Sequence, residues 1–176
     1  YFKGYDLMNG SYLGPYFSDK EIVITNKKHR AVCERIESFD DLTKKVATLI
    51  SDGNIVGWFQ GRSEFGPRAL GNRSILADPR NPEMQKKLNL KIKYREGFRP
   101  FAPSVLEEDY SKFFEGKILS PYMLMVKKIQ PKIKTEIPED YLELDYYDKL
   151  YTRRSILQSI THVDFSARIQ TVSKKT

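Results

Sequence analysis

The 176-residue sequence is poor in metal-binding and redox-active side chains, with one cysteine, Cys33, and two histidines, His29 and His162. A single cysteine cannot form a disulfide within the chain, and these three residues have no spacing typical of a zinc site. No apolar run approaches the roughly 20 residues that a membrane-spanning helix requires. We therefore expect a soluble protein of a reducing, cytoplasmic setting that has no membrane partner and no metal ligands.

Apolar and basic residues are abundant in the sequence. Hydrophobic residues make up 40% and aromatic residues 12% of the chain, which is enough for one globular domain with a real core. The formal net charge is +7, so an anionic partner is favoured, but charge alone does not separate a nucleotide from a nucleic acid. The sequence begins at Tyr1 rather than Met, and we expect it to be a piece of a longer protein.

The segment Gly61–Ser74 holds three arginines and three glycines directly after a strand-like run, Ile55–Phe59. Glycine lets the backbone approach a ligand closely, and guanidinium groups offer paired donors that match phosphate and carboxylate oxygens. The spacing matches neither a Walker loop nor a dinucleotide fingerprint. An isolated surface arginine is commonly just solvated, but a loop mounted on a core strand favours an anion site.

A second basic cluster spans Lys91–Ser104, so that residues 60–100 hold ten Lys and Arg against four Asp and Glu. Lys91 and Lys93 lie on different sides of a continuous helix, where cations also complement the helix dipole. Arg99 stands between Phe98 and Pro100, in an apolar segment where an unpaired cation would be costly to bury.

Periodicity and breakers predict a succession of helices and strands, as in an α/β fold. Residues 1–30 show no sustained period and are interpreted as a linker, with the domain over 31–176. The pattern predicts helices over 38–53, from Asn81–Pro82 to Lys93, and over 107–114, and strands over 54–60, 74–77, 122–126 and 163–172. Residues 129–160 are interpreted as a partly helical excursion over the surface.

Two further polar groups have simple structural interpretations. Ser104 has no nucleophile motif around it, which argues against serine hydrolase chemistry. His162 and Asp164 lie two residues apart and could share a strand face with Arg168. We interpret His162 with Asp164 as a hydrogen-bonded pair rather than a catalytic set, because no nucleophile accompanies them.

Long motifs carry a family resemblance. They are Gly57–Arg62, Glu64–Arg80, Asn89–Glu96, Phe98–Val105, Ser120–Met123 and Thr161–Asp164. Together they closely resemble carbamoyltransferases of the nodulation-protein and antibiotic-tailoring type, over most of residues 12–172. The region corresponds to the C-terminal domain of that family, which is similar in fold to YrdC-like threonylcarbamoyl-adenylate synthases. The resemblance thus implies an α/β fold with a twisted mixed sheet flanked by helices.

The resemblance implies an enzyme that uses Mg-bound ATP and carbamoyl phosphate to form carbamoyl-adenylate. A separate N-terminal acceptor domain of the same polypeptide would then move the carbamoyl group to a hydroxyl, and iron is expected only in that domain. Carried over by motif, the residues implied to be catalytic are Lys93, Arg68 and Arg99, and those implied to bind substrate are Arg168, Arg62, Asn72, Ser104 and His162. Clustered cations are apt for bringing two polyanions together.

Two departures from the family pattern stand out. Phe165–Ser166 replaces the usual Gly-Thr before Ala-Arg, and the excursion before Thr161 is longer than usual. We expect the C-terminal segment of the family, which the resemblance implies helps to complete the ligand site, to be missing after Thr176. We therefore expect a truncated domain that folds and binds ligand weakly but does not complete carbamoyl transfer alone.

A different class of function also fits the basic region. Phe59, Phe65, Tyr94, Phe98 and Phe101 are interleaved with the cations, and aromatic stacking beside cations is how proteins grip single-stranded nucleic acid. The alternative is thus a nucleic-acid-binding module without catalysis. Nucleic-acid binding weakens steeply with salt, whereas an enclosed small-anion site gives saturable, competitive binding of ATP and carbamoyl phosphate.

Overall fold

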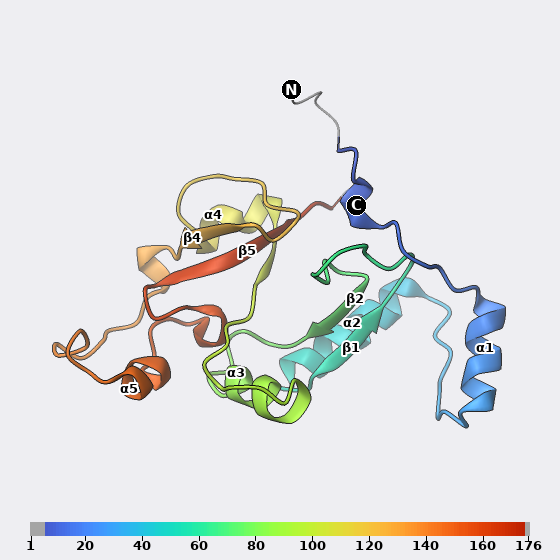
Figure 1. Ribbon diagram of the computed structural model, residues 1–176, viewed down its shortest axis with the longest axis horizontal. Coiled ribbons are helices and arrows are strands. Elements are labelled where there is room, and N and C mark those ends of the chain that lie inside the picture. Colours follow the sequence, from blue (N-terminus) through green and yellow to red (C-terminus); the bar gives the residue numbers. More distant parts are fainter. Residues whose placement is uncertain (1–5, 175–176) are drawn as a thin grey trace. The chain divides into compact units, whose positions relative to one another are not determined.

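The computed structural model describes residues 6–174, which fall into two compact units, Tyr1–Ala77 and Asp78–Thr176 (Figure 1). Each unit is described separately below as unit 1 and unit 2. Within the described residues, no helix is both long and apolar enough to cross a lipid bilayer.

Unit 1 combines helices with a two-stranded antiparallel sheet. Its elements are a 3₁₀ turn at Asn9–Ser11, α1 at Asp19–Lys28, α2 at Phe39–Ser51, β1 at Val56–Phe59 and β2 at Arg73–Leu76. The predicted helix over 38–53 is confirmed: the side chain of Ser38 caps its first turn by accepting from the Asp41 N–H. Val56 pairs with Leu76 and Phe59 with Arg73, so the two strands place the Gly/Arg loop at one end of a hairpin.

The helix α1 was missed by the sequence analysis, which took residues 1–30 as an irregular linker. Ser18 and Glu21 form a capping box, in which the Ser18 N–H donates to Glu21 Oε2 at 2.8 Å and the Glu21 N–H donates to Ser18 Oγ at 3.4 Å. No residue of α1 is buried, so local capping rather than an apolar stripe marks this helix. A search for periodicity cannot detect a helix of that kind.

Unit 2 contains more short elements around a three-stranded sheet. They are α3 at Met84–Lys87 with a π-helical turn at Leu88–Ile92, β3 at Ser104–Leu106, a 3₁₀ turn at Glu107–Asp109, α4 at Tyr110–Phe113, β4 at Met125–Lys128, a 3₁₀ turn at Pro131–Ile133, α5 at Tyr146–Tyr151, a 3₁₀ turn at Gln158–Ile160 and β5 at Ser166–Val172. The predicted helices over 81–93 and 107–114 are both present, in shorter pieces.

The strand β5 is the centre of that sheet. It runs parallel to β3, with Ser104 opposite Gln170, and antiparallel to β4, with Val126 opposite Arg168. The sheet is therefore mixed, which confirms the predicted α/β class, although the strands of the chain are divided between two sheets. The strand predicted over 122–126 begins three residues later and is largely exposed, not buried.

The core of unit 2 packs against the inner face of this sheet. Its buried members are Val105, Tyr110, Phe114, Ile129, Ile133, Ile160, Ala167 and Ile169. The predicted surface excursion thus supplies part of the core, because Ile129, Ile133 and Ile160 are at most 5% exposed. The excursion is partly helical as predicted, but its apolar residues fold inward since they can bury area against β5.

Candidate functional site

The Gly/Arg loop of unit 1 closes around a buried carboxylate. Glu64 is 4% exposed, and its Oε1 accepts from the backbone N–H groups of Leu70 at 2.6 Å and Asn72 at 2.7 Å. Its Oε2 accepts from Arg73 Nε at 3.2 Å. Desolvation raises the pKa of Glu64, but these hydrogen bonds and the Arg73 charge outweigh it, so the net pKa lies below the ordinary value. Glu64, the residue on which the loop is built, was not among the site residues predicted from sequence.

Asn72 and Arg62 are engaged within the same loop. Asn72 Nδ2 donates to the Arg62 carbonyl at 2.8 Å, and Asn72 Oδ1 accepts from Gln60 Nε2 at 3.3 Å. The Arg62 guanidinium is exposed and makes a long 3.5 Å bond to the Leu13 carbonyl. Asn72 therefore supports the loop, with both ends of its amide already bonded.

Arg68 differs from the other arginines of the loop. It is half-buried, and its Nε is shielded from solvent without a hydrogen-bond acceptor among residues 6–174. Gly66 and Gly71, on either side, have φ values of 133° and 137°, which L-residues rarely adopt. These glycines shape the turn that presents Arg68, while Arg73 is held by Glu64.

In unit 2, Asn89 organises the second basic segment. It is fully buried, and its Nδ2 donates to the carbonyls of Gly97 at 3.1 Å and Arg99 at 2.8 Å. Its Oδ1 accepts from Arg95 Nε at 2.7 Å, and the Arg95 guanidinium also lies 5.0 Å from the centre of the Phe101 ring. Arg95 is thereby committed to the protein, and the segment 93–99 loops around one amide.

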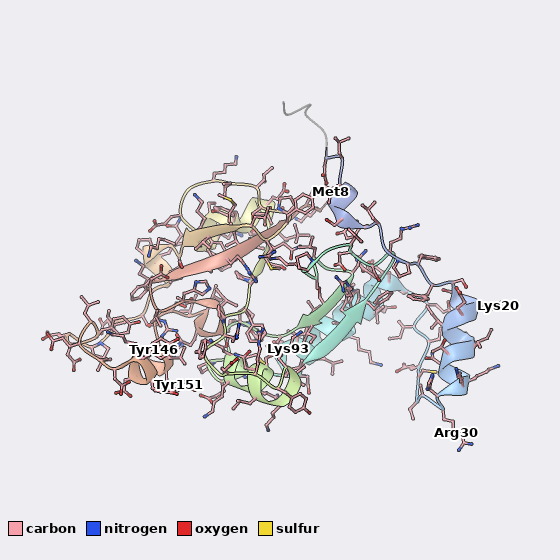
Figure 2. All side chains as sticks on the ribbon, in the orientation of Figure 1. Met8, Lys20, Arg30, Lys93, Tyr146 and Tyr151 are labelled. Atoms are coloured by element: carbon pink, nitrogen blue, oxygen red, sulfur yellow. The ribbon has the colours of Figure 1, made fainter. Side chains whose placement is uncertain are left out.

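Lys93 ends the π-helical turn and is exposed (Figure 2). Within the described part of the chain, its ammonium group makes no hydrogen bond or ion pair. Tyr94 follows in the left-handed region at φ 48°, so the chain turns sharply just after Lys93. Lys93 is thus held on an ordered turn with its charge directed to solvent.

Arg99 is exposed, although its neighbours in the sequence are apolar. Its side chain is 53% exposed and pairs with Glu96, with Nε 3.1 Å from Oε2, and its guanidinium lies 5.9 Å from the Phe98 ring centre. Exposed ion pairs of this type contribute little to stability, so a ligand could compete with Glu96 for Arg99.

Two predicted residues lie on the strands of the mixed sheet. Ser104, on β3, donates its hydroxyl to Gln170 Oε1 at 2.8 Å, across the parallel pair. Arg168 is half-buried on β5. Its charge is close enough to His162 to lower the pKa of that histidine.

His162 begins a tight turn that ends at Ser166. It was expected on a strand and bonded to Asp164, but both side chains instead contact Ser166: His162 Nδ1 lies 3.1 Å from Ser166 Oγ, which donates to Asp164 Oδ1 at 2.6 Å. The Asp164 Oδ2 also pairs with Lys128 at 3.2 Å. The turn is possible because Phe165 takes φ 62°, which places the chain out of strand geometry.

The surroundings of His162 and Asp164 fix the charge state of each side chain. Burial is the main cause that lowers the pKa of His162, with Arg168 and Arg154 adding to it and Asp164 opposing it. Burial raises the pKa of Asp164, but hydrogen bonds from Ser166 and Lys128 more than offset this and lower it. The imidazole is therefore neutral and the carboxylate ionised near neutral pH.

Arg154 is a buried residue that sequence reasoning missed. It is 1% exposed, and its guanidinium donates to the carbonyls of Lys149, of Leu150 and Thr152 at 3.0 Å, and of Thr161 at 2.9 Å. As one half of an Arg153–Arg154 pair in a charged region, it carries no signal of burial in the sequence.

The predicted residues divide between the units: Arg62, Arg68 and Asn72 belong to unit 1, and Lys93, Arg99, Ser104, His162 and Arg168 belong to unit 2. Within unit 2, the structure brings His162 and Arg168 near each other. Over residues 6–174, no three or more His, Cys, Asp or Glu side chains are grouped so as to hold a metal ion.

Comparison with known proteins identifies the family of the chain. The family model of the carbamoyltransferase C-terminus matches residues 47–176. The chain belongs to the carbamoyltransferase C-terminal family. The match covers the Gly/Arg loop, the Lys93–Arg99 segment and the turn at His162.

Relatives of this carbamoyltransferase domain are considerably longer. The chain is 53% identical to an uncharacterised Synechocystis protein, with 97% of the chain and 28% of the relative covered. It is 47% identical to the nodulation protein NolNO of Sinorhizobium fredii, over 79% of the chain and 18% of the relative. It is 39% identical to the 3'-hydroxymethylcephem-O-carbamoyltransferase of Amycolatopsis lactamdurans, over 73% of the chain and 20% of the relative. The matched region thus covers 18% to 28% of the length of these three relatives.

Proposed function

We propose that this domain forms carbamoyl-adenylate from ATP and carbamoyl phosphate, as the activating half of an O-carbamoyltransferase. Water releases phosphate from carbamoyl phosphate and leaves carbamate. A carbamate oxygen then bonds to the α-phosphorus of ATP, and pyrophosphate leaves. The carbamoyl group would pass to a hydroxyl acceptor on a further domain of the same polypeptide, and Mg²⁺ would accompany the ATP phosphates.

The observation that carries this proposal is the pattern of cations within a carbamoyltransferase domain. Each basic segment commits one arginine to the protein, Arg73 to Glu64 and Arg95 to Asn89. Each also presents another cation, Arg68 Nε and the Lys93 ammonium, that has no acceptor in the described part of the chain. Cations without a protein partner on ordered turns are suited to bind phosphate oxygens.

Some of the remaining predicted residues would bind the ligand, and the others would support the site. Arg99 and Arg168 would add charge to the carbamoyl phosphate site, with Arg99 exchanging Glu96 for the ligand. His162 would contact substrate. Asn72 and Arg62 would support the loop that carries Arg68, and Ser104 would act through its contact with Gln170, since the side chains of Ser104 and Asn72 already have partners.

The test is binding of ATP and of carbamoyl phosphate to the purified chain by calorimetry, with pyrophosphate release measured in a longer polypeptide that carries it. Lys93→Ala and Arg68→Ala should each weaken carbamoyl phosphate binding about tenfold or more, because each removes a charge-assisted contact. Lys91→Ala is the matched control, as it removes one exposed positive charge two residues from Lys93. Undiminished binding and release in both variants would refute the assignment.

Membership of the carbamoyltransferase family favours this activity over the nucleic-acid-binding alternative. The same calorimeter separates the two. Single-stranded RNA binding that falls steeply with salt, together with no binding of carbamoyl phosphate, would support the alternative.

A further inference from the structure

Unit 2 contains a pocket of about 200 Å³ that is lined in part by His162 and for which the proposed function names no particular ligand. Its apolar lining includes Phe98, Pro100, Tyr146 and Leu150, and the rings of Phe98 and Tyr146 meet edge to face at 6.2 Å. Tyr146 lies on α5, within the excursion over residues 129–160 (Figure 2). Pockets for drug-sized ligands measure roughly 300–1,000 Å³, so this one suits a molecule of only a few heavy atoms and not a nucleotide.

The polar lining of the pocket includes Arg154, a buried cation without a counter-charge. No carboxylate in residues 6–174 pairs with it, and its four carbonyl acceptors leave Nε without a partner. Burial lowers the pKa of Arg154, and the Tyr141 hydroxyl opposes this only in part. A buried guanidinium is costly unless it is paired, so an oxyanion in this pocket would relieve that cost.

His162 lines the same pocket and offers a hydrogen-bond acceptor, whereas Arg154 offers a donor. An ionised carboxylate only accepts hydrogen bonds, so the 2.6 Å contact to Asp164 uses the hydrogen of the Ser166 hydroxyl. Ser166 Oγ must then accept from His162 Nδ1–H. In the neutral imidazole this leaves a lone pair on Nε2, which is buried and has no donor among the described residues.

A ligand complementary to both residues must accept from Arg154 and donate to His162. We infer that the pocket binds a small planar oxyanion that also carries a hydrogen-bond donor, the chemistry shared by carbamate and bicarbonate. One oxygen would accept from Arg154, and the N–H or O–H would donate to His162 Nε2. A carboxylate such as acetate lacks that donor.

Entry of such a ligand needs a small movement, because neither Arg154 Nε nor His162 Nε2 is reached by solvent. The Tyr146 ring, which is 55% exposed, is the part of the lining best able to move. If carbamate is the occupant, the inference rests on the proposed function and makes this pocket the place where carbamate is kept from water.

The chain offers a direct test, because it has only two histidines. Side-chain nitrogen NMR should show His162 with hydrogen on Nδ1 and a bare Nε2, and exposed His29 serves as the internal reference. Addition of ¹³C-bicarbonate should shift the His162 Nε2 resonance in a saturable way and leave His29 unchanged. Acetate should bind about tenfold more weakly, since one hydrogen bond is missing. Hydrogen on Nε2, or equal responses to the two anions, would overturn the inference.

Variants test whether the NMR response of His162 depends on its hydrogen bond to Ser166. Ser166→Ala removes the acceptor that fixes the tautomer and should weaken bicarbonate binding about tenfold, as one ordered hydrogen bond is lost. Ser111→Ala, at an exposed serine, should have no effect. Tyr146→Ala tests the pocket without touching its polar groups and should also change the affinity. Unchanged binding in both Ser166→Ala and Tyr146→Ala would place bicarbonate elsewhere.

Adding ammonium to the bicarbonate separates the two ligands, because carbamate forms and gives its own ¹³C resonance. Selective broadening of either resonance by the wild-type protein identifies that molecule as the occupant, and broadening of neither contradicts the inference. The inference and the proposed function can fail separately. Bicarbonate binding at His162 without pyrophosphate formation would contradict only the proposed function, and pyrophosphate formation without a response of His162 would contradict only the inference.

Discussion

Both basic segments order their backbone around one buried polar side chain, but the two side chains differ in hydrogen-bonding chemistry. The loop of unit 1 is built around Glu64, which only accepts, and so gathers backbone N–H groups and the Arg73 guanidinium. The segment 93–99 of unit 2 is built around Asn89, whose amide donates to two carbonyls and accepts from Arg95. Each centre fixes one arginine to order the backbone. The comparison teaches that in such segments the arginine with the best internal geometry is the one that supports the structure.

The units also differ in what holds them together. Among its described residues, the buried apolar side chain of unit 1 is Leu70, whereas unit 2 has a cluster that includes Phe114, Ile129 and Ile169. Unit 1 therefore depends more on buried polar contacts, and unit 2 on apolar area. Three substitutions test this difference.

The largest effect is expected in the core of unit 2. Phe114 is 1% exposed, and Phe114→Ala should lower the free energy of unfolding by about 3–5 kcal/mol, through lost burial and a residual cavity. Urea denaturation followed by circular dichroism measures the change. Phe65→Ala, at a ring that is 70% exposed, should cost less than about 0.5 kcal/mol. Equal losses at the two positions would contradict the proposed difference between the units.

An intermediate effect is expected for Asn89→Ala. It leaves two carbonyls and the Arg95 Nε without their partner, which should cost about 2–3 kcal/mol and loosen the turn that carries Lys93. Urea denaturation and carbamoyl phosphate affinity should both respond. Asn54→Ala removes one exposed amide-to-carbonyl bond and is the control. A change in stability without any change in affinity would separate Asn89 from the ligand site.

The smallest effect is expected for Glu64→Gln, at about 1–2 kcal/mol near neutral pH, because the backbone bonds can persist while the charge is lost. The folded pKa of Glu64 lies below the ordinary value of 4.5, so its stabilisation is complete above that pH and is lost as the pH falls through the folded pKa. The fluorescence of Trp58, the single tryptophan, follows unit 1 in urea titrations from pH 7 to pH 3. The variant should show a shallower loss toward acid, and an unchanged slope would exclude this role for Glu64.

Much of the fold was accessible from sequence where local signals and burial agree. The helix α2 has a serine cap and an apolar stripe, and β5 has an alternating pattern at the centre of a sheet. The helix α1 lacks a buried stripe, and β3 is a three-residue strand beside prolines that depends on its distant partner β5. Elements defined by distant partners leave little local trace.

The candidate site divides in the same way. Composition and motif found Arg68 and Lys93, because glycines and prolines around cations are visible in the sequence. Glu64, Asn89 and Arg154 were missed, since their importance comes from complete burial among backbone groups. The contact of His162 and Asp164 through Ser166 was also hidden, as it requires the left-handed turn at Phe165.

The central position of β5 has a consequence for how the protein is made. Since β3 and β4 both pair with β5, which follows them in the sequence, neither has its sheet partner until the ribosome has synthesised Ser166–Val172. Until β5 has been made, β3 and β4 both expose strand edges, a state in which strands are prone to intermolecular pairing. Synthesis of this sheet is therefore a period in which chaperone protection matters most.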